Sequence, residues 1–403
     1  MTHTMRLINR LPSGLAALML LATLLVAGPT QTSAQSFAAP VQYPSGGASP
    51  AAITGGDFNR DAQEDIAVTN QNSNMIGILL GNGDGTFQAA TAYNVHFAPR
   101  SIAAGDINRD GKTDLAVGNE ASSDISLLLG NGDGTFQAAV NYGPIDRPEF
   151  ICIKDLNTDG KLDLAIAGFG GQVFVLLGLG DGTFQPPVAY PTGSGSMSVD
   201  ANDFNRDALL DLAVANQDSS NVSVLLGNGN GTFQPAVNYP VGPYPASVKT
   251  ADFNGDGRPD IVTAELGSPV DFNSLVSILL GNEDGTFSAA VNYAAGIGGY
   301  SVALADFNAD GKLDLAVSDI YGNNVSVLSG NVDGTFQAAT SYSTGQGTQP
   351  FSVLAADFNG DGRPDLATAN FFASSVSVLL STPPAPSSSM PKHREKTSHK
   401  RIK

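Results

Sequence analysis

The chain alternates between short apolar runs and polar turns over most of its 403 residues. The apolar runs are four to six residues long and rich in valine, isoleucine, leucine and alanine, as at residues 66–69, 115–118, 212–215 and 222–226. Glycine, asparagine and aspartate separate them, which is typical of strands joined by tight hairpins. No part of this region has the apolar spacing of an amphipathic helix. The pattern therefore predicts an all-β fold.

This strand pattern repeats seven times. An Asp-x-Asn sequence starts each copy, and successive copies begin 49, 49, 48, 49, 54 and 51 residues apart. Each copy contains two apolar runs, then a glycine-rich turn such as Gly-Asn-Gly-Asp-Gly, and in six copies a Thr-Phe segment that ends in tyrosine. Four short strands in about 50 residues are the signature of a propeller blade. We predict a seven-bladed β-propeller with four antiparallel strands in each blade.

The last copy lacks its fourth strand, and the N-terminal residues supply one. The seventh copy stops near Leu380 without the segment that runs from phenylalanine to tyrosine. Residues 37–43 have the same six-residue offset between Phe37 and Tyr43. We expect this N-terminal strand to complete the last blade and close the ring, which removes a free sheet edge. An open solenoid would need atypical capping repeats, and the sequence shows none.

The two ends of the chain differ in composition from the repeats. Residues 1–34 contain two arginines, a short apolar run and a small-residue exit, the layout of a cleavable secretory signal. The run is short for a membrane span, which needs about 20 residues, so we favour export over an uncleaved N-terminal anchor. Residues 383–403 form a Pro/Ser-rich linker and a basic tail that we expect to be disordered. The propeller is assigned to residues 35–382, and the mature protein is expected to be extracellular, periplasmic or on the cell surface.

The charge of the chain lies mainly in acidic residues of the repeats. There are 20 lysine and arginine residues against 38 aspartate and glutamate residues, a net charge of -18. Residues 35–386 contain 12 basic and 37 acidic residues, a net charge of -25. This balance argues against a nucleic-acid binder held by phosphate contacts. The single cysteine, Cys152, excludes an intramolecular disulfide, and we expect its thiol to be buried.

The acids occupy fixed positions of a nine-residue loop at the start of each copy. Aspartate stands at positions 1, 5 and 9 and asparagine at position 3 in all seven copies. These groups would repel one another without a cation, and converging hard oxygens are the ligands that Ca2+ prefers. We predict one calcium ion per blade, up to seven in all, with the backbone oxygen of position 7, whose side chain is expected to be unrestricted, as a further ligand. In the order of positions 1, 3, 5, 7 and 9, the predicted ligands are Asp57, Asn59, Asp61, Gln63 and Asp65; Asp106, Asn108, Asp110, Lys112 and Asp114; Asp155, Asn157, Asp159, Lys161 and Asp163; Asp203, Asn205, Asp207, Leu209 and Asp211; Asp252, Asn254, Asp256, Arg258 and Asp260; Asp306, Asn308, Asp310, Lys312 and Asp314; and Asp357, Asn359, Asp361, Arg363 and Asp365.

Two other interpretations of these loops fit less well. The spacing matches the first nine positions of an EF-hand loop, but position 12 is Val68 in the first copy, and strands flank the loop. Simple Asx-rich turns would not require aspartate at position 9 in every copy. Position 6 is glycine in five copies but Ala62 and Ala208 in the first and fourth. Because a non-glycine residue in a left-handed conformation costs about 1 kcal/mol, we expect the first and fourth sites to be the weaker ones.

The repeat resembles a known family. Asp-Phe-Asn-Gly-Asp-Gly-Arg-Pro-Asp at residues 252–260 and 357–365, with Gly-Asn-Gly-Asp-Gly-Thr-Phe at 81–87 and 130–136, is similar to the FG-GAP/VCBS repeats of integrin alpha-subunit heads and many bacterial secreted proteins. The resemblance covers about residues 36–380. It implies calcium between the first and second strands of each blade, on the lower face, and a partner on the upper face. Unlike integrin heads, this chain has a complete loop in all seven repeats, and nothing in it resembles integrin leg domains.

Function is expected where the copies differ, in the loops of the upper face. Insertions lengthen residues 267–273 and, slightly, residues 45–51 and 344–350. The seven tyrosines that end the fourth strands repeat in every blade, so we expect them to be structural. The non-repeated polar and aromatic candidates for a ligand surface are His96, Arg100, Glu120, Asp146, Arg147, Glu149, Phe169, Tyr244, Glu265, Asp271, Phe272, Tyr300, Tyr321, Phe371 and Phe372.

These features predict a secreted, calcium-binding propeller that acts as a non-catalytic binding or adhesion module for an extracellular protein or glycan. The alternative is an extracellular polysaccharide lyase or hydrolase that uses carboxylates such as Glu120 with Asp146 or Glu149. The sequence contains no zinc-protease histidine pair and no serine nucleophile elbow. We therefore predict no catalytic residue. The absence of tryptophan disfavours sugar stacking. A third option is that the basic tail holds the protein on an anionic cell surface.

Overall fold

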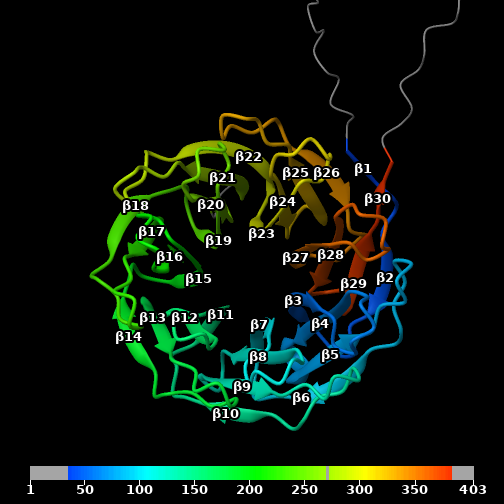
Figure 1. Cartoon of the computed structure of the whole chain (residues 1–403). Helices are drawn as coiled ribbons and strands as arrows, with labels where there is room; N and C mark the ends of the chain where they lie inside the picture. The colour runs from blue at the N-terminus through cyan, green and yellow to red at the C-terminus, as the bar shows by residue number, and fades with distance from the viewer. Residues whose placement is uncertain (1–34, 269–271, 384–403) are drawn as a thin grey trace, which may run out of the picture. The chain divides into compact units, whose positions relative to one another are not determined.

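The computed structural model describes residues 35–268 and 272–383. Within them the chain forms seven four-stranded antiparallel sheets and one two-stranded sheet, and the seven larger sheets surround a central axis as propeller blades (Figure 1). The one helical element of the described residues is a turn of 3-10 helix, η1 (Gln71–Ser73). The predicted all-β, seven-bladed architecture is confirmed. The assigned signal sequence and basic tail lie outside the described residues.

Each blade is a meander whose first strand is nearest the axis and whose fourth strand is outermost. From inner to outer strand, the blades are β3 (Pro50–Gly56), β4 (Asp65–Asn70), β5 (Met75–Leu79) and β6 (Thr91–Asn94); β7 (Pro99–Gly105), β8 (Asp114–Asn119), β9 (Asp124–Leu128) and β10 (Val140–Tyr142); β11 (Pro148–Lys154), β12 (Asp163–Gly168), β13 (Gln172–Leu176) and β14 (Val188–Pro191); β15 (Ser196–Asn202), β16 (Asp211–Asn216), β17 (Asn221–Leu225) and β18 (Val237–Pro240); β19 (Pro245–Ala251), β20 (Asp260–Glu265), β21 (Asn273–Leu279) and β22 (Val291–Ile297); β23 (Gly299–Ala305), β24 (Asp314–Asp319), β25 (Asn324–Leu328) and β26 (Thr340–Ser343); and β27 (Pro350–Ala356), β28 (Asp365–Asn370), β29 (Ser375–Leu379) and β2 (Val41–Pro44).

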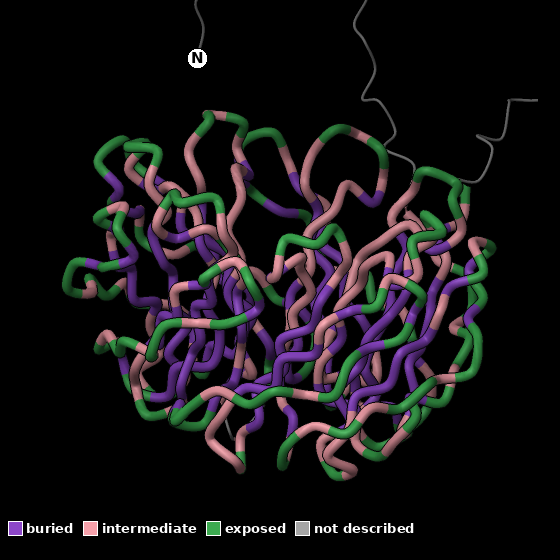
Figure 2. The backbone as a smooth tube through the Cα atoms, turned by 60° about the horizontal axis from the view of Figure 1, so that its bottom comes forward, coloured by how far each residue is buried: buried purple, intermediate pink, exposed green. Residues whose placement is uncertain are grey.

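The core lies between the blades, which explains the unbroken apolar runs in the sequence. The second strands, such as β4 and β8, are buried at all six positions. Side chains alternate between the two faces of a strand, and each face of a blade packs against a neighbouring blade. One cluster joins Cys152 and Val175 of blade 3 to Val199 and Val214 of blade 4. Buried residues therefore lie between the blades, and exposed residues lie in the loops at the two ends of the ring and along the outer fourth strands (Figure 2).

Aromatic pairs join each blade to the next. The tyrosine at the end of a fourth strand meets a phenylalanine of the following blade edge to face, with ring centroids 4.9 to 5.8 Å apart. Such contacts are favourable because the positive edge of one ring meets the negative face of the other. The prediction that these tyrosines are structural is confirmed. The pairs are Tyr43 with Phe87, Tyr93 with Phe136, Tyr142 with Phe184, Tyr190 with Phe233, Tyr239 with Phe287, Tyr293 with Phe336 and Tyr342 with Phe37.

The segment from phenylalanine to tyrosine is not one continuous strand. In blade 2, Phe136 forms an isolated bridge with Gly130, and β10 begins only at Val140. The buried ring of Phe136 contacts Phe58 and Tyr93 of the neighbouring blade. Because the backbone follows this ring into the seam between blades, the fourth strand is shorter than the sequence predicts.

The N-terminal residues close the ring as predicted. β2 pairs with β29, with Tyr43 opposite Val376. β1 (Ser36–Phe37) pairs with β30 (Ser381–Thr382), with Phe37 opposite Ser381. The inner strands β27 and β3 also pack side by side, as the other neighbouring inner strands do. Blade 7 therefore meets blade 1 through the same contacts that join the other blades.

Antiparallel pairing places the loops of each blade at alternating ends of the ring. The nine-residue loops join first to second strands, and we call the end that carries them the lower face. The loops from second to third strands, and those between blades, lie at the opposite end, the upper face. In blade 5 the insertion accompanies two long strands, β21 and β22, of seven residues each.

Candidate functional site

Each inner strand has a register shift near the upper face. In β7 the shift falls between Pro99 and Ser101, so Arg100 has no partner residue in β8. An extra residue of this kind bends the strand and re-aims its own side chain. The equivalent residue stands six positions before the first aspartate of every copy, and all seven line the upper end of the central channel. They are Ala51, Arg100, Glu149, Met197, Ala246, Tyr300 and Phe351, which we call the axial residues.

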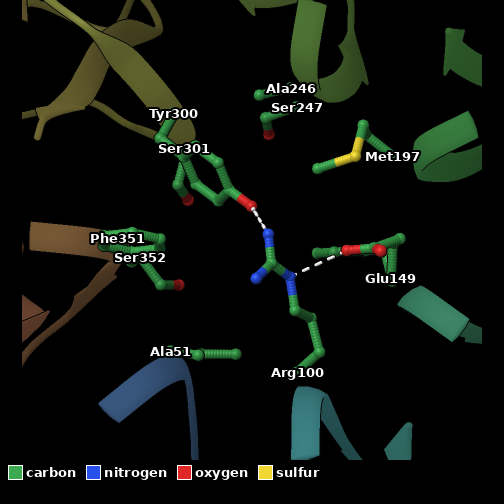
Figure 3. Close-up of a pocket in the computed structure, with 12 residues that line it drawn as sticks. Ala51, Arg100, Glu149, Met197, Ala246, Ser247, Tyr300, Ser301, Phe351 and Ser352 are labelled. Carbon is green, nitrogen blue, oxygen red and sulfur yellow. Dashed lines mark hydrogen bonds and ion pairs between the residues drawn. The ribbon is translucent and has the colours of Figure 1, made fainter. Parts of the chain in front are cut away.

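Three axial residues meet across the channel (Figure 3). The Nε of Arg100 donates to Glu149 Oε2 at 2.8 Å, and its Nη2 donates to the hydroxyl of Tyr300 at 2.5 Å. These residues come from blades 2, 3 and 6. The side chain of Glu149 is 2% exposed and that of Arg100 is 21% exposed. Arg100 therefore ties blades that are not neighbours in the ring.

The surroundings of these groups favour a charged arginine and a neutral phenol. Tyr300, Glu149 and Glu120 raise the pKa of the Arg100 guanidinium above its ordinary value. Burial raises the pKa of Glu149, and Arg100 opposes this effect. Burial also raises the pKa of Tyr300. The phenol is thus a neutral acceptor for a permanently charged guanidinium.

A second ion pair extends this polar side of the upper face. Arg147 Nη2 lies 3.1 Å from Glu120 Oε1, and the guanidinium lies over the ring of Phe169 at 4.2 Å from its centroid. Gln71 donates to the other oxygen of Glu120 at 3.2 Å. Arginines therefore engage both Glu120 and Glu149, two of the carboxylates that the sequence offers for catalysis.

Aromatic rings occupy the other side of the upper face. Tyr300 packs against Phe351 with centroids 5.0 Å apart, and Phe351 stacks on Phe371 at 4.6 Å. Phe372 contacts Phe371 at 5.3 Å and is 67% exposed. A row of rings therefore leads from the channel to solvent on blades 6 and 7.

Further exposed aromatic residues lie on the same face. Phe272 and Tyr321 form a pair with centroids 4.7 Å apart, and both are exposed, as is Tyr244. Phe97 is 65% exposed. Phe97 was not among the predicted candidates, although it follows His96 in the same loop, and neither were the axial residues Met197 and Phe351. Counting six positions back from the first aspartate would have found both axial residues.

The outcomes differ for three other predicted candidates. Glu265 is fully buried at the end of β20, so its assignment to the surface is wrong. The ring of His96 is engaged by Asp124, with Nδ1 2.5 Å from the carboxylate. Asp271 lies outside the described residues.

The space between the axial residues is small. The pocket that they form with the next residues of their strands has a volume of about 40 Å3. A volume of this size accommodates about one water molecule and no sugar ring. As it stands, the upper end of the channel is a plug of packed side chains.

The seven acidic loops lie on the lower face, between the first and second strands. In the first loop the N–H of Asp61 donates to Asp57 Oδ1 at 3.1 Å and to Asn59 Oδ1 at 3.0 Å. The same two contacts occur in the other six loops. The oxygens of positions 1 and 3 therefore meet at one point in every loop. This convergence of hard oxygens fits calcium.

The aspartate at position 9 has a structural role in addition to the predicted role as a calcium ligand. Asp65 is fully buried, its Oδ2 accepts the N–H of Phe58 at 2.9 Å, and its Oδ1 accepts the N–H of Gly81 at 2.8 Å. Equivalent bonds recur in every blade, with Ser381 replacing the glycine in the seventh. Burial raises the pKa of these carboxyls, to about 6 in Asp163, Asp211, Asp260 and Asp314.

Contrary to expectation, the side chain at position 7 is restricted, because it forms an ion pair in five of the loops. Lys112 Nζ lies 3.1 Å from Asp110 Oδ2. Basic residues at position 7 make the same pair with position 5 in four further loops. No group of three or more His, Cys, Asp or Glu side chains in residues 35–268 and 272–383 is placed to hold a metal ion. A calcium ion in one of these loops would therefore need asparagine and peptide oxygens as ligands in addition to carboxylates.

The family comparison agrees with this loop and blade geometry. The model of the FG-GAP-like repeat matches residues 57–117, 155–214, 203–263, 270–317 and 306–368, and the model of the FG-GAP repeat matches residues 98–137. The chain belongs to the FG-GAP repeat family. Comparison with curated proteins gives no match.

Solved structures share the fold of this FG-GAP propeller. BBS1N in complex with ARL6DN, soaked with lead, is 10% identical, with a TM-score of 0.56 over 85% of this chain and 98% of that chain. The same complex soaked with mercury is 11% identical, with a TM-score of 0.56 over 85% and 97%. A functionally unknown protein from Desulfotomaculum acetoxidans DSM 771 is 13% identical, with a TM-score of 0.53 over 72% and 84%. At these identities the likeness shows the fold alone.

Two other features of the FG-GAP propeller complete the description. Cys152 is buried, as expected, and burial raises the pKa of its thiol to about 12. None of the helices found within the described ranges is long and apolar enough to cross a membrane.

Proposed function

We propose that this FG-GAP propeller is a secreted, calcium-binding, non-catalytic module that binds an extracellular protein or glycan through its upper face. The observation that carries the proposal is the set of exposed aromatic side chains on that face, where the repeats differ. Phe97 and Phe372 are 65% and 67% exposed, and Tyr321 is 49% exposed. Exposed aromatic side chains gathered on one face are typical of binding surfaces.

Rigid support strengthens this interpretation. The exposed Phe372 is backed by Phe371, Phe351 and Tyr300, and Tyr300 is fixed by Arg100. A surface whose side chains are already ordered loses less entropy on binding. BBS1N, solved in complex with ARL6DN, gives a precedent for this fold as a binding platform.

The upper-face proposal is tested by comparing matched variants. Phe372→Ala and Tyr321→Ala remove exposed rings from the upper face, and Val332→Ala removes an exposed apolar side chain in a turn between a third and a fourth strand, on the lower face. We expect the first two variants to bind a partner found by glycan array, or by capture from the extracellular fraction, at least tenfold more weakly. The third should bind as the unaltered protein does. Equal binding by all three variants would rule out the upper face as the contact surface.

Calcium is the second part of the proposal, and each loop contributes one site. The ligands would be the oxygens of positions 1, 3, 5 and 9 and the peptide oxygen of position 7, and the ion would neutralise the converging carboxylates. The test is an elemental count on metal-exchanged protein together with thermal unfolding in EGTA. We expect five to seven ions and a lower unfolding temperature in EGTA. A count well below five contradicts the proposal.

Export is the third part, and it rests on the signal-like layout of residues 1–34. The expected mature protein begins at Gln35 and is found outside the cytoplasm. Mass measurement of the exported protein checks this. A product that keeps residues 1–34 and sediments with membranes would establish the anchor instead.

The structure offers no observation in favour of a polysaccharide lyase or hydrolase. Glu120 and Glu149 are both engaged by arginine, and the volume of about 40 Å3 between the axial residues is too small for a sugar. We therefore propose no catalytic function.

A further inference from the structure

Below the axial residues the central channel widens into a cavity. Its volume is about 470 Å3, and it is lined by the middle and lower parts of the inner strands of all seven blades. The plug formed by Arg100, Glu149 and Tyr300 closes its upper end. Lys154, which also lines the cavity, is exposed at the lower end of β11. The cavity is therefore a blind pocket that opens on the lower face.

The basic residues of the propeller have an uneven distribution. Of the 12 between residues 35 and 386, eight belong to the nine-residue loops. The remaining four are Arg100, Arg147, Lys154 and Lys249. Arg100 and Arg147 are paired with glutamates of the upper face. Lys154 and Lys249 both line the lower cavity, so the two cations without a role in the loops or the plug share one pocket.

Lys154 and Lys249 differ from the other lysines that the structure describes, because those lysines form ion pairs with aspartates. Lys112, Lys161 and Lys312 each lie within 3.1 Å of an aspartate oxygen. Neither Lys154 nor Lys249 forms an ion pair with any residue that the structure describes. A cation in a cavity without a paired anion attracts one from solution.

The neighbours of Lys249 define the shape of the ligand. Its Nζ lies 5.2 Å from the centroid of the Phe150 ring. Asp200 also lines the cavity, and its Oδ2 accepts from the backbone N–H and the hydroxyl of Thr250 at 2.8 and 2.9 Å. These neutral donors fix the carboxylate without cancelling its charge, so the lining carries two cations and one anion. The rest of the wall is largely apolar and includes Leu304 and Leu354. The pocket thus presents two ammonium groups beside a ring and aliphatic side chains.

We propose that the lower channel is a binding site for a small organic anion, with a carboxylate or phosphate group held by Lys249 and Lys154 and an apolar body against Phe150 and the aliphatic wall. The volume of about 470 Å3 suits a ligand with one ring. The site is separate from the upper face and from the acidic loops, so it does not depend on the proposed function.

The sequence contains a signal for this site. Lys249 stands three positions before the first aspartate of its copy, where the other blades have Thr54, Ala103, Cys152, Asp200, Ala303 and Leu354. A lysine occurs at this position once in seven copies. Because the repeats build the scaffold, such a departure inside the channel indicates a local requirement.

The test is titration calorimetry on the full-length mature protein with calcium present. Phenylacetate and phenyl phosphate serve as anionic probes with an apolar ring, inorganic phosphate as an anion without one, and benzyl alcohol as the neutral control. We expect saturable binding of at least one ring-bearing anion, and binding of the alcohol or of inorganic phosphate at least tenfold weaker. The two ring-bearing probes distinguish a carboxylate ligand from a phosphate ligand.

Matched lysine variants locate the site. Lys249→Met and Lys154→Met should each weaken binding of the anionic probe at least tenfold, and Lys161→Met, which removes a lysine of a lower-face loop, should leave it unchanged. Circular dichroism on each variant shows that the fold is retained, and Lys154, which is exposed, provides a variant with little effect on packing. If no ring-bearing anion binds, or if all three variants bind equally, the proposal is wrong. Loss of upper-face binding in Phe372→Ala with unchanged anion binding would separate this site from the proposed function.

Discussion

At the scale of single residues, the aspartate at position 9 shows that one repeated residue can have two causes. Its buried carboxylate accepts N–H groups from the loop and from the turn after the third strand, as Asp65 does from Phe58 and Gly81. These bonds alone favour aspartate there in every blade, with or without a metal. The case for calcium therefore rests more on positions 1, 3 and 5, whose oxygens gather around the loop backbone. In the first loop these are Asp57, Asn59 and Asp61.

Position 6 gives the most direct test of backbone strain. Ala62 and Ala208 have φ angles of 63° and 65°, as the sequence predicted, and Gly111 and Gly160 adopt the same conformation with 79° and 77°. Ala62→Gly should raise the free energy of unfolding by roughly 0.5 kcal/mol, since relief of about 1 kcal/mol of strain is partly offset by a more flexible unfolded chain. Gly111→Ala should lower it by a similar amount, because no atom lies within 4 Å of the added Cβ and only the φ angle matters. Urea unfolding measures both changes. If Ala62→Gly is not stabilised and Gly111→Ala is not destabilised, the backbone of these loops relaxes without strain.

Glu265 predicts a pH dependence of stability. It occupies the position at the end of the second strand where four blades have asparagine, and burial raises its pKa to about 8. Because this value lies above the ordinary 4.5, its contribution to stability is complete below about pH 4.5 and is lost as the pH rises through 8. Between pH 6 and pH 8 the unaltered protein should therefore lose about 2 kcal/mol of unfolding free energy relative to Glu265→Gln, which has no carboxyl to ionise at this position. Thermal unfolding across this range checks the slope, and Glu283→Gln, which removes a carboxylate at an exposed position, is the matched control.

At the scale of elements, the register shift of the inner strands explains which part of the site the sequence could predict. The sequence placed Arg100, Glu149 and Tyr300 among the residues that differ between copies. It could not place them at one point, because a bulge moves one side chain out of the alternation that the apolar pattern reports. Met197 and Phe351 were missed for the same reason, since they look like ordinary strand residues. The wrong assignment of Glu265 has the opposite cause, because a charged residue next to a loop is usually exposed.

Tyr300 tests whether the transaxial contact contributes to stability. Tyr300→Phe removes the acceptor of Arg100 Nη2 and keeps the ring against Phe351. We expect a loss of about 1 to 2 kcal/mol in the free energy of unfolding, because a largely buried charged donor is left without its partner. Tyr321→Phe is the matched control on the same face, and its exposed hydroxyl should cost little. Equal losses in the two variants would mean that the Arg100 contact adds nothing specific.

At the scale of the whole molecule, closure of the ring was predictable because the repeat has a frame. The six complete copies fix what the seventh lacks, and the N-terminal residues supply that element with the same Phe-to-Tyr offset. The depth and polarity of the channel were not predictable, because they depend on how seven inner strands approach one axis. The two lysines of the lower cavity come from blades 3 and 5, and no local pattern connects them.

Removing the closing strand should therefore affect the entire ring. Deletion of residues 35–44 leaves β29 as a free edge and removes Phe37 and Tyr43 from their contacts with Tyr342 and Phe87. Because every blade is held by its two neighbours, we expect one cooperative unfolding transition at a clearly lower temperature, together with association through the exposed edge. Differential scanning calorimetry and size-exclusion chromatography measure the two effects. A synthetic peptide of residues 35–44 should restore the transition and the monomeric elution when added in trans, and a scrambled peptide should not. A truncated protein that unfolds at the original temperature would show that the ring does not depend on this strand, and that the contacts between inner strands are sufficient to close it.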